Sequence, residues 1–251
     1  NGKADKETLS VCLASEPLSI DPALNSSADG ATMLAHLFSG IAKWSEDENG
    51  NLIIVADAVE ELTEGTVNSD GTVTYIYTLK DDLKWSDGRD VTASDFVYAW
   101  NRAASPELAG DYNYMFDVIK GYSDMWESVE TGEYDKDGNP ILKYVNPNAK
   151  LAVEATSEKT LVVTLNNKVT YWNELLAFPT YYPVREDIVA DESWATKPET
   201  YVSNGPYNLT AWEHNSFITI TKNNDHYEAN YITVPAIKFY LSDNTNNMLT
   251  N

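Results

Sequence analysis

Alternating apolar and polar residues predict strands at several places along the chain. Residues Thr72 to Leu79 (TVTYIYTL) alternate most regularly, which is the pattern of a strand with one buried face. Leu9 to Leu13 is a shorter run of the same type. Leu151 to Ala155 and Thr160 to Leu165 are two further runs separated by a short polar loop, an arrangement typical of a β-hairpin.

Apolar residues spaced three and four positions apart predict helices between these strands. The spacing predicts one helix from Asp29 or Gly30 to Ser39 and a longer one from Val118 to Thr131. It also predicts a short helix over Tyr171 to Leu176. Strands that alternate with helices in this way indicate the α/β class with mixed sheets.

The stretch Lys84 to Arg102, KWSDGRDVTASDFVYAWNR, combines a tight turn with the start of a helix. Gly88 supplies a turn conformation that other residues resist. Thr92 or Ser94 is a suitable N-cap, and Asp95 places negative charge in the first helical turn, where the helix dipole stabilises it. By these criteria alone the stretch is a packing element without chemistry.

The residue pattern of this stretch is more specific than the turn and helix signals that it contains. K-W-S-D-G-x-x-V-T-A-x-D-F-V-Y-x-W-x-R closely resembles the signature of bacterial extracellular solute-binding proteins of the oligopeptide/dipeptide class (family 5), the receptors of peptide-importing ABC transporters. Two further segments resemble the same family: S-E-P-x-S-I-D-P at residues 15–22 and x-N-G-P-Y-x-L-x-x-W at residues 203–212. The resemblance covers nearly the whole chain.

This resemblance implies a periplasmic-binding-protein-like fold of the class II, cluster C type, with two lobes built from mixed sheets. Residues 1–44 would form the first segment of one lobe, residues 45–179 an inserted smaller lobe that contains the signature, and residues 180–251 the second segment of the first lobe. Family members usually continue well beyond this length. The resemblance therefore implies that the chain is an N-terminal half, truncated at the hinge before a C-terminal lobe.

In the family, an extended peptide lies between the lobes and pairs its main chain with short strand segments. The segment after the Asp-Pro turn would offer one such backbone edge, a tyrosine after the signature helix would face the ligand, and the N-G pair would lie near the floor of the cleft. The residues to which the resemblance assigns these roles are Asn25, Ser26, Ser27, Ala28, Tyr112, Asn204 and Gly205.

Each of these assignments has a structural alternative. Ser26 to Ala28 is equally consistent with a plain loop, and Tyr112 with an ordinary surface or core tyrosine. Asn204 and Gly205 also fit a turn with positive φ before a strand that starts at Tyr207. The groups that clamp the ends of a peptide would lie mostly in the C-terminal half.

Composition narrows the possible partners. The chain has 251 residues, a formal net charge of −22 and a sequence pI near 4.3, which argues against nucleic acid and anionic membrane surfaces because both require clustered Lys and Arg. This charge favours cationic over anionic ligands, although a local pocket can override it.

The single cysteine, Cys12, excludes an internal disulfide and fits a buried position in the first strand. No apolar run approaches the ~18 residues that a transmembrane helix needs.

The sequence indicates no catalytic, cofactor or metal site. G-x-S-x-G, P-loop and dinucleotide-binding motifs are absent, and His36, His214 and His226 are scattered without ligand spacing. The D-x-D-G-N loop at residues 135–139 is similar to the start of a calcium-binding loop, but the position that requires Glu is Asn146. A solvated turn is the simpler interpretation.

The resemblance implies an extracellular substrate-binding component of an ABC importer that captures oligopeptides without catalysis. Its partners would be the oligopeptide and the permease subunits, and the protein would be a monomer, either a cell-surface lipoprotein with a lipid anchor upstream of residue 1 or periplasmic. Relatives that take oligosaccharides, nickel, haem or glutathione leave another solute open, and the aromatic residues would suit sugar stacking. An acidic surface adhesion or scaffold module is a further alternative. We expect the isolated 251-residue chain to fold but to bind peptide weakly or not at all.

Overall fold

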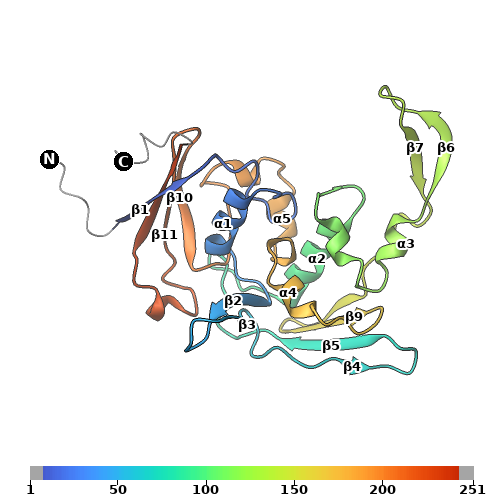
Figure 1. Cartoon of the computed structure of the whole chain (residues 1–251), viewed down its shortest axis with the longest axis horizontal. Coiled ribbons are helices and arrows are strands. Elements are labelled where there is room, and N and C mark those ends of the chain that lie inside the picture. Colours follow the sequence, from blue (N-terminus) through green and yellow to red (C-terminus); the bar gives the residue numbers. More distant parts are fainter. Residues whose placement is uncertain (1–7, 243–251) are drawn as a thin grey trace.

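A mixed four-stranded sheet occupies one end of the molecule (Figure 1). The computed structural model describes residues 8–242, and in it β1 pairs in parallel with β12 while the other neighbours are antiparallel. The order across the sheet is β1 (Thr8–Leu13), β12 (Ala236–Leu241), β11 (Phe217–Lys222) and β10 (Tyr207–Glu213). The helix α1 (Ala28–Leu37) contacts β10. Segments from the two ends of the described chain therefore build one sheet.

A second four-stranded sheet is entirely antiparallel. Its order is β4 (Thr66–Val67), β5 (Val73–Thr78), β9 (Thr160–Leu165) and β8 (Val153–Ser157), and the helix α2 (Ala93–Ala104) packs on β8 and β9. The strand predicted at residues 72–79 is confirmed as β5, and the predicted hairpin as β8 with β9. Together the two sheets and their helices confirm the α/β class.

Two hairpins and several short helices complete the described chain. The hairpin of β2 (Ala42–Glu46) and β3 (Leu52–Ala56) lies below α1 in Figure 1, and that of β6 (Ser128–Tyr134) and β7 (Pro140–Tyr144) projects at the far right. The short helices are α3 (Tyr122–Trp126), α4 (Trp172–Leu176), α5 (Glu186–Val189) and the 3-10 turns η1 (Asn113–Phe116), η2 (Pro179–Tyr181), η3 (Trp194–Thr196) and η4 (Ala229–Tyr231). None of the helices within residues 8–242 has the length and apolar character to cross a bilayer.

The helix predicted from Val118 to Thr131 is wrong. Only Tyr122–Trp126 is helical there, and the residues that follow form the hairpin of β6 and β7. Gly121, at φ +97°, redirects the chain just before the short helix. The β-branched Val129 and Thr131 suit a strand once the turn at residues 135–139 brings its partner alongside.

The helix α2 follows directly from the sequence of its first turn. Thr92 is the N-cap, and the carboxylate of Asp95 accepts hydrogen bonds from the Thr92 N–H (2.9 Å) and the Trp85 indole (3.2 Å). Burial raises the pKa of Asp95, and these hydrogen bonds oppose that change. On the buried face of the helix, the indole N–H of Trp100 donates to the carbonyl of Tyr181 (2.7 Å). The signature stretch is therefore a packing element in this structure.

A single cluster of buried side chains runs through both sheets. The strands of the mixed sheet come from residues 8–13 and 207–241, and those of the antiparallel sheet from residues 66–165. The lobe boundaries expected after residues 44 and 179 stay a prediction, and residues 1–7 and 243–251 of those segments lie outside the described residues. Cys12 is half-buried on β1.

A buried ion pair joins the signature helix to the Asp-Pro turn. Arg102, in the last turn of α2, donates to both carboxylate oxygens of Asp21 (3.0 and 2.7 Å). Asp21 is 2% exposed and also accepts the N–H of Ala23 (3.0 Å) and the indole N–H of Trp194 (3.3 Å). Because several donors converge on one carboxylate, the turn is fixed against the helix.

Removing the Asp21 carboxylate would leave the Arg102 guanidinium, whose side chain is only 15% exposed, without its partner. We therefore expect Asp21→Ala to lower the free energy of unfolding by about 3–5 kcal/mol. Asp90→Ala is the matched control, because Asp90 pairs with Lys84 in solvent, and it should change the stability little. Urea denaturation followed by tryptophan fluorescence compares the two variants, and equal effects would contradict this role of the buried pair.

Candidate functional site

The segment from Ser15 to Ala28 leaves the mixed sheet at the end where the parallel strands β1 and β12 finish. In α/β proteins, ligands bind outside the carboxyl ends of parallel strands. Pro17 and Pro22 keep this segment from pairing regularly with the sheet, so it runs as a loop to the start of α1. This loop is therefore the candidate site.

Three of the four predicted edge residues are fixed by the local structure. Asn25 is 6% exposed, and its side-chain oxygen accepts the backbone N–H of Ser27 (3.2 Å). Ser27 is the N-cap of α1, and its hydroxyl accepts the N–H of Gly30 (3.1 Å). Ala28 is exposed and begins the helix. The path of the loop is thus set by its own hydrogen bonds.

Ser26 differs from its neighbours because its backbone is unpaired. Its side chain is exposed, and no hydrogen bond within residues 8–242 uses its N–H or its carbonyl. An unpaired donor and acceptor on an exposed, fixed turn are what main-chain recognition of an extended peptide requires.

The structure brings the loop that contains Tyr112 against the same segment. The chain approaches so closely that a Cβ on Gly110 would lie 2.3 Å from the carbonyl oxygen of Ala23. Tyr112 is half-buried, and its ring meets the ring of Phe178 edge-on, with centroids 5.0 Å apart. The predicted edge and the predicted tyrosine therefore belong to adjoining loops.

Asn204 and Gly205 lie elsewhere, at the other end of α1. Asn204 is 3% exposed, and its side chain accepts the N–H of Ser39 (3.1 Å) and donates to the Ser39 carbonyl (2.9 Å). Gly205 donates to the carbonyl of Leu37 (2.9 Å), and a Cβ there would meet the Leu37 carbonyl carbon at 2.3 Å. The prediction of a positive φ at this pair is wrong. Position 205 instead requires a glycine because the two backbones approach each other closely. Their contact with a ligand stays a prediction.

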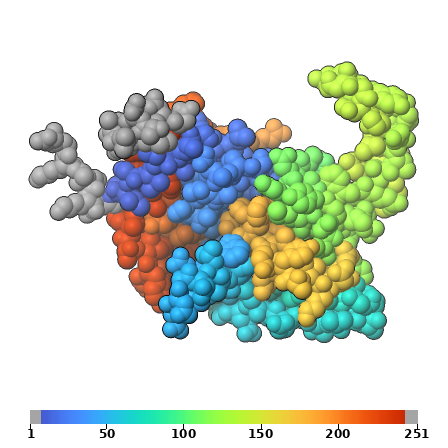
Figure 2. Space-filling model, in the orientation of Figure 1, coloured from blue at the N-terminus to red at the C-terminus, as the bar shows by residue number. Residues whose placement is uncertain are grey.

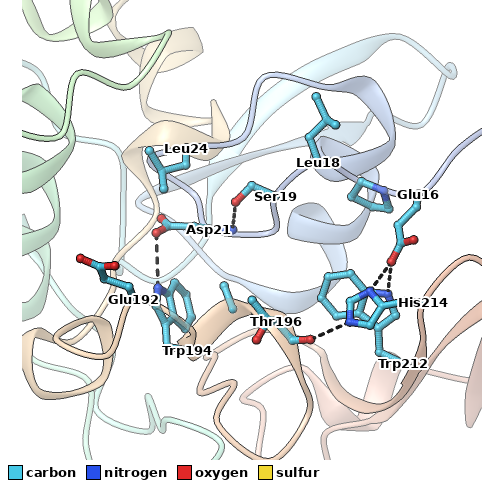
Figure 3. A pocket seen from close by; sticks show the side chains of 12 residues that line it. Glu16, Leu18, Ser19, Asp21, Leu24, Glu192, Trp194, Thr196, Trp212 and His214 are labelled. Carbon is cyan, nitrogen blue, oxygen red and sulfur yellow. Dashed lines mark hydrogen bonds and ion pairs between the residues drawn. The ribbon is translucent and has the colours of Figure 1, made fainter.

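A cavity of about 380 Å³ opens beside the loop (Figure 3). Its walls come from residues 16–24, from residues 192–196 and from Trp212 and His214 at the end of β10. One carboxylate oxygen of Glu16 accepts the Trp212 indole N–H (2.7 Å) and faces Nδ1 of His214 (2.6 Å), and the other accepts the N–H of Asn215 (2.8 Å). Glu16 therefore joins the loop to the turn between β10 and β11.

The ring of His214 lies between two acceptors. Its Nδ1 faces the Glu16 carboxylate, and its Nε2 faces the carbonyl of Thr196 (3.1 Å), so only the doubly protonated ring donates to both. Burial disfavours the charged form of Glu16, but hydrogen bonds from Asn215, His214 and Trp212 lower its pKa below the ordinary value. Sequence reasoning missed this pair, because Glu16 and His214 are 198 positions apart.

The acidic turns of the chain are stabilised by hydrogen bonds to their own backbone. The carboxylate of Asp135 accepts the N–H groups of Asn139 (2.8 Å) and Asp137 (2.9 Å), which lower its pKa. Asp47 accepts the N–H groups of Asn49 and Asn51 (both 2.8 Å) in the same way. No group of three or more His, Cys, Asp or Glu side chains within residues 8–242 could hold a metal ion.

Comparison with known families adds an independent observation. The sequence matches the family model described as "Bacterial extracellular solute-binding proteins, family 5 Middle" over residues 57–250. The chain belongs to this family. The resemblance seen in the signature stretch is thus confirmed over most of the chain.

Several known proteins are similar to this chain in sequence or in fold. The chain is 34% identical to the oligopeptide-binding protein OppA of Bacillus subtilis, over 99% of this chain and 42% of the relative. It is 30% identical to the probable deoxycholate-binding periplasmic protein YgiS of Escherichia coli, over 92% of this chain and 39% of the relative. The structure of Listeria monocytogenes OppA bound to peptide superposes with a TM-score of 0.80 at 27% identity, covering 98% of this chain and 45% of that chain. The fold expected from the resemblance is confirmed, and the chain spans less than half the length of these relatives.

We expect Glu16→Gln to lower the free energy of unfolding at pH 7 by about 1–3 kcal/mol, because the charged acceptor of its hydrogen bonds is lost. The pKa of Glu16 is lowered on folding, so its contribution is present above the pKa of the unfolded chain and disappears as the pH falls through the folded pKa. The stabilities of the two proteins should therefore differ by a constant amount at neutral pH and converge only as the pH falls below 4.5, the pKa of the unfolded carboxyl. Glu154→Gln, on the exposed side of β8, is the control, and a difference independent of pH would contradict the assignment.

Proposed function

We propose that this chain supplies one wall of an oligopeptide-binding site in the substrate-binding component of an ABC importer. The observation that carries the proposal is the unpaired backbone of Ser26 on an exposed turn, with the Tyr112 loop against the same segment. Main-chain groups are the same in every peptide, so such an edge would capture peptides with little regard to their sequence. Peptide binding in the names of two of the relatives above supports this reading.

The second wall of the site would come from a further part of the protein. The chain covers 42% of the length of the Bacillus relative, which leaves room for a lobe that this chain does not contain. Residues 1–44 and 180–251 would form one lobe and residues 45–179 the smaller one. The complete protein would close around its ligand by hinge bending.

The protein would act by binding alone, without catalysis. The family description, solute binding, supports this, and so does a candidate site built from backbone groups and aromatic rings. Its partners would be the peptide and the permease subunits of the importer. It would be a monomer that is either held at the cell surface by a lipid anchor or periplasmic, and a net charge of −22 suits a protein that must stay dispersed.

Ser26 offers a direct test of main-chain pairing. In the complete protein, Ser26→Pro removes the N–H and should weaken peptide binding about tenfold or more, which corresponds to about 1.4 kcal/mol. Ser26→Ala is the matched control, because it keeps the backbone and should leave the affinity unchanged. Calorimetric titration with tri- to pentapeptides measures both, and equal affinities of the two variants would contradict the role of this edge.

The isolated 251-residue chain offers a second test. It should unfold cooperatively but bind the same peptides weakly or not at all, because one wall of a cleft buries too little of the ligand. Micromolar binding by this chain alone would overturn the two-wall site. Heat from sugars, nickel or deoxycholate, with none from peptides, would leave the family assignment intact but show that the ligand is not a peptide. Capture of a protein partner without any small ligand would favour an adhesion module.

A further inference from the structure

A second cavity opens at the end of α1 that is far from the Ser26 turn. It has a volume of about 310 Å³, and its walls come from the end of α1, β2, residues 177–182 and residues 226–228. In Figure 2, the blue surface of α1, the light-blue surface of β2 and β3 and the gold surface around residues 170–180 lie on one face of the molecule. The cavity thus lies among elements that share a face with α1.

The cavity and the Ser26 turn lie at opposite ends of α1. Ala28 and Ala35 lie on the exposed side of the helix, two turns apart, and Ala35 lines the cavity. Phe178 also lines it, and the same ring contacts Tyr112. Seven helical residues span about 10 Å, which is the length of about three residues of an extended peptide. A peptide that pairs at Ser26 and runs along α1 would therefore place a side chain in the cavity about three residues along.

Aromatic side chains form the apolar walls of the cavity. Phe178, Tyr182 and Trp44 line it, and Trp44 is 54% exposed. Aromatic faces attract the guanidinium of arginine and the ammonium of lysine, and they also pack against the alkyl stems of these side chains. The walls therefore suit a long side chain with a cationic end.

The polar side of the cavity carries two carboxylates around one ammonium. Nζ of Lys43 lies 2.5 Å from Oε2 of Glu228 and 3.3 Å from Oδ1 of Asp57. Asp57 is 4% exposed, and it also accepts a hydrogen bond from the hydroxyl of Tyr227. Lys80 donates to the backbone carbonyl of Asp57 (2.6 Å). The positive charge of Lys43 is thus already offset within the lining.

Glu228 carries the accessible negative charge. Its side chain is 37% exposed, and among the described residues only Lys43 bonds its carboxylate, through one oxygen. Burial raises the pKa of Asp57, an effect that Lys43 opposes. His226 is neutral at pH 7, because burial lowers its pKa to about 4, and its Nδ1 accepts the N–H of Glu228 (3.1 Å). The second oxygen of Glu228 is therefore the acceptor that a cation would meet.

We propose that this cavity is a subsite for a basic side chain, arginine or lysine, of the bound peptide. The inference rests on the proposed function, because it assigns a side-chain preference to the same peptide site. The aromatic walls would hold the stem and the flat guanidinium, and Oε1 of Glu228 would accept a charge-assisted hydrogen bond from its end. A net charge of −22 attracts any cationic peptide, but only a subsite makes the preference depend on position.

The test uses pentaalanine peptides that carry one arginine at each position in turn, with citrulline as the uncharged replacement of the same shape. The peptides are titrated into the complete protein. At one position the arginine peptide should bind about tenfold more tightly than the citrulline peptide, and at the other positions the two should bind about equally. This position-specific ratio is the quantity to compare between variants.

Glu228→Gln keeps the shape of the side chain and removes its charge, so it should abolish the tenfold ratio. Glu154→Gln removes the same charge from the exposed side of β8 and should preserve the ratio. Trp44→Leu removes an aromatic wall and should also reduce the arginine-to-citrulline ratio. This second variant keeps the test decisive if Glu228→Gln fails to fold.

Peptide binding without a position-specific ratio, or a ratio that survives both Glu228→Gln and Trp44→Leu, overturns the subsite and leaves the peptide site intact. A complete absence of heat from every peptide overturns the proposed function, and the subsite with it.

Discussion

The buried carboxylate of Asp21 is the constraint on which the candidate site depends. Its side chain is held by Arg102 of the signature helix, while its backbone carbonyl accepts the N–H groups of Leu24 (3.1 Å) and Asn25 (2.9 Å). One residue therefore ties the helix of the antiparallel sheet to the loop that leaves the mixed sheet. A buried carboxylate is costly unless its acceptor positions are filled, so loss of the contact with the helix would destabilise the loop as well.

This coupling explains how an unpaired backbone can persist at Ser26. A free donor and acceptor on a mobile loop would have to be ordered by the ligand, and that ordering would reduce the affinity. Here the neighbouring residues, Asn25 and Ser27, already carry the hydrogen bonds that shape the turn. The exposed groups of Ser26 are consequently presented in one position.

The sequence predicted those features that depend on short stretches of chain. The cap at Thr92, the alternation in β5 and the hairpin of β8 and β9 follow from local patterns. The family followed from the residue pattern of the signature, and the resemblance also named Ser26 and Tyr112, which the fold brings to adjoining loops. Each of these depends on residues that are close in sequence or fixed by a motif.

The features that were missed depend on residues that meet only in the folded chain. Nothing in the spacing of Glu16 and His214, or of Lys43 and Glu228, indicates that they pair, since 198 and 185 positions separate them. The false helix at residues 118–131 has a different origin, because its partner strand follows directly after the turn at residues 135–139 and the helical spacing of the apolar residues extends into the first strand of that hairpin. Gly205 was assigned to a turn, whereas it is the packing against Leu37 that demands a glycine.

The turns at Asp47–Asn51 and Asp135–Asn139 have one further consequence. In both, the first aspartate accepts the N–H groups two and four residues later, and the chain closes with the same backbone bonds. One of these turns ends a hairpin beside the core, and the other ends an arm that projects from it (Figure 1). The same closure therefore forms in both surroundings, because its hydrogen bonds join only residues within the turn. The length of either hairpin can change without redesign of its tip, and the reach of the arm is set by its strands alone.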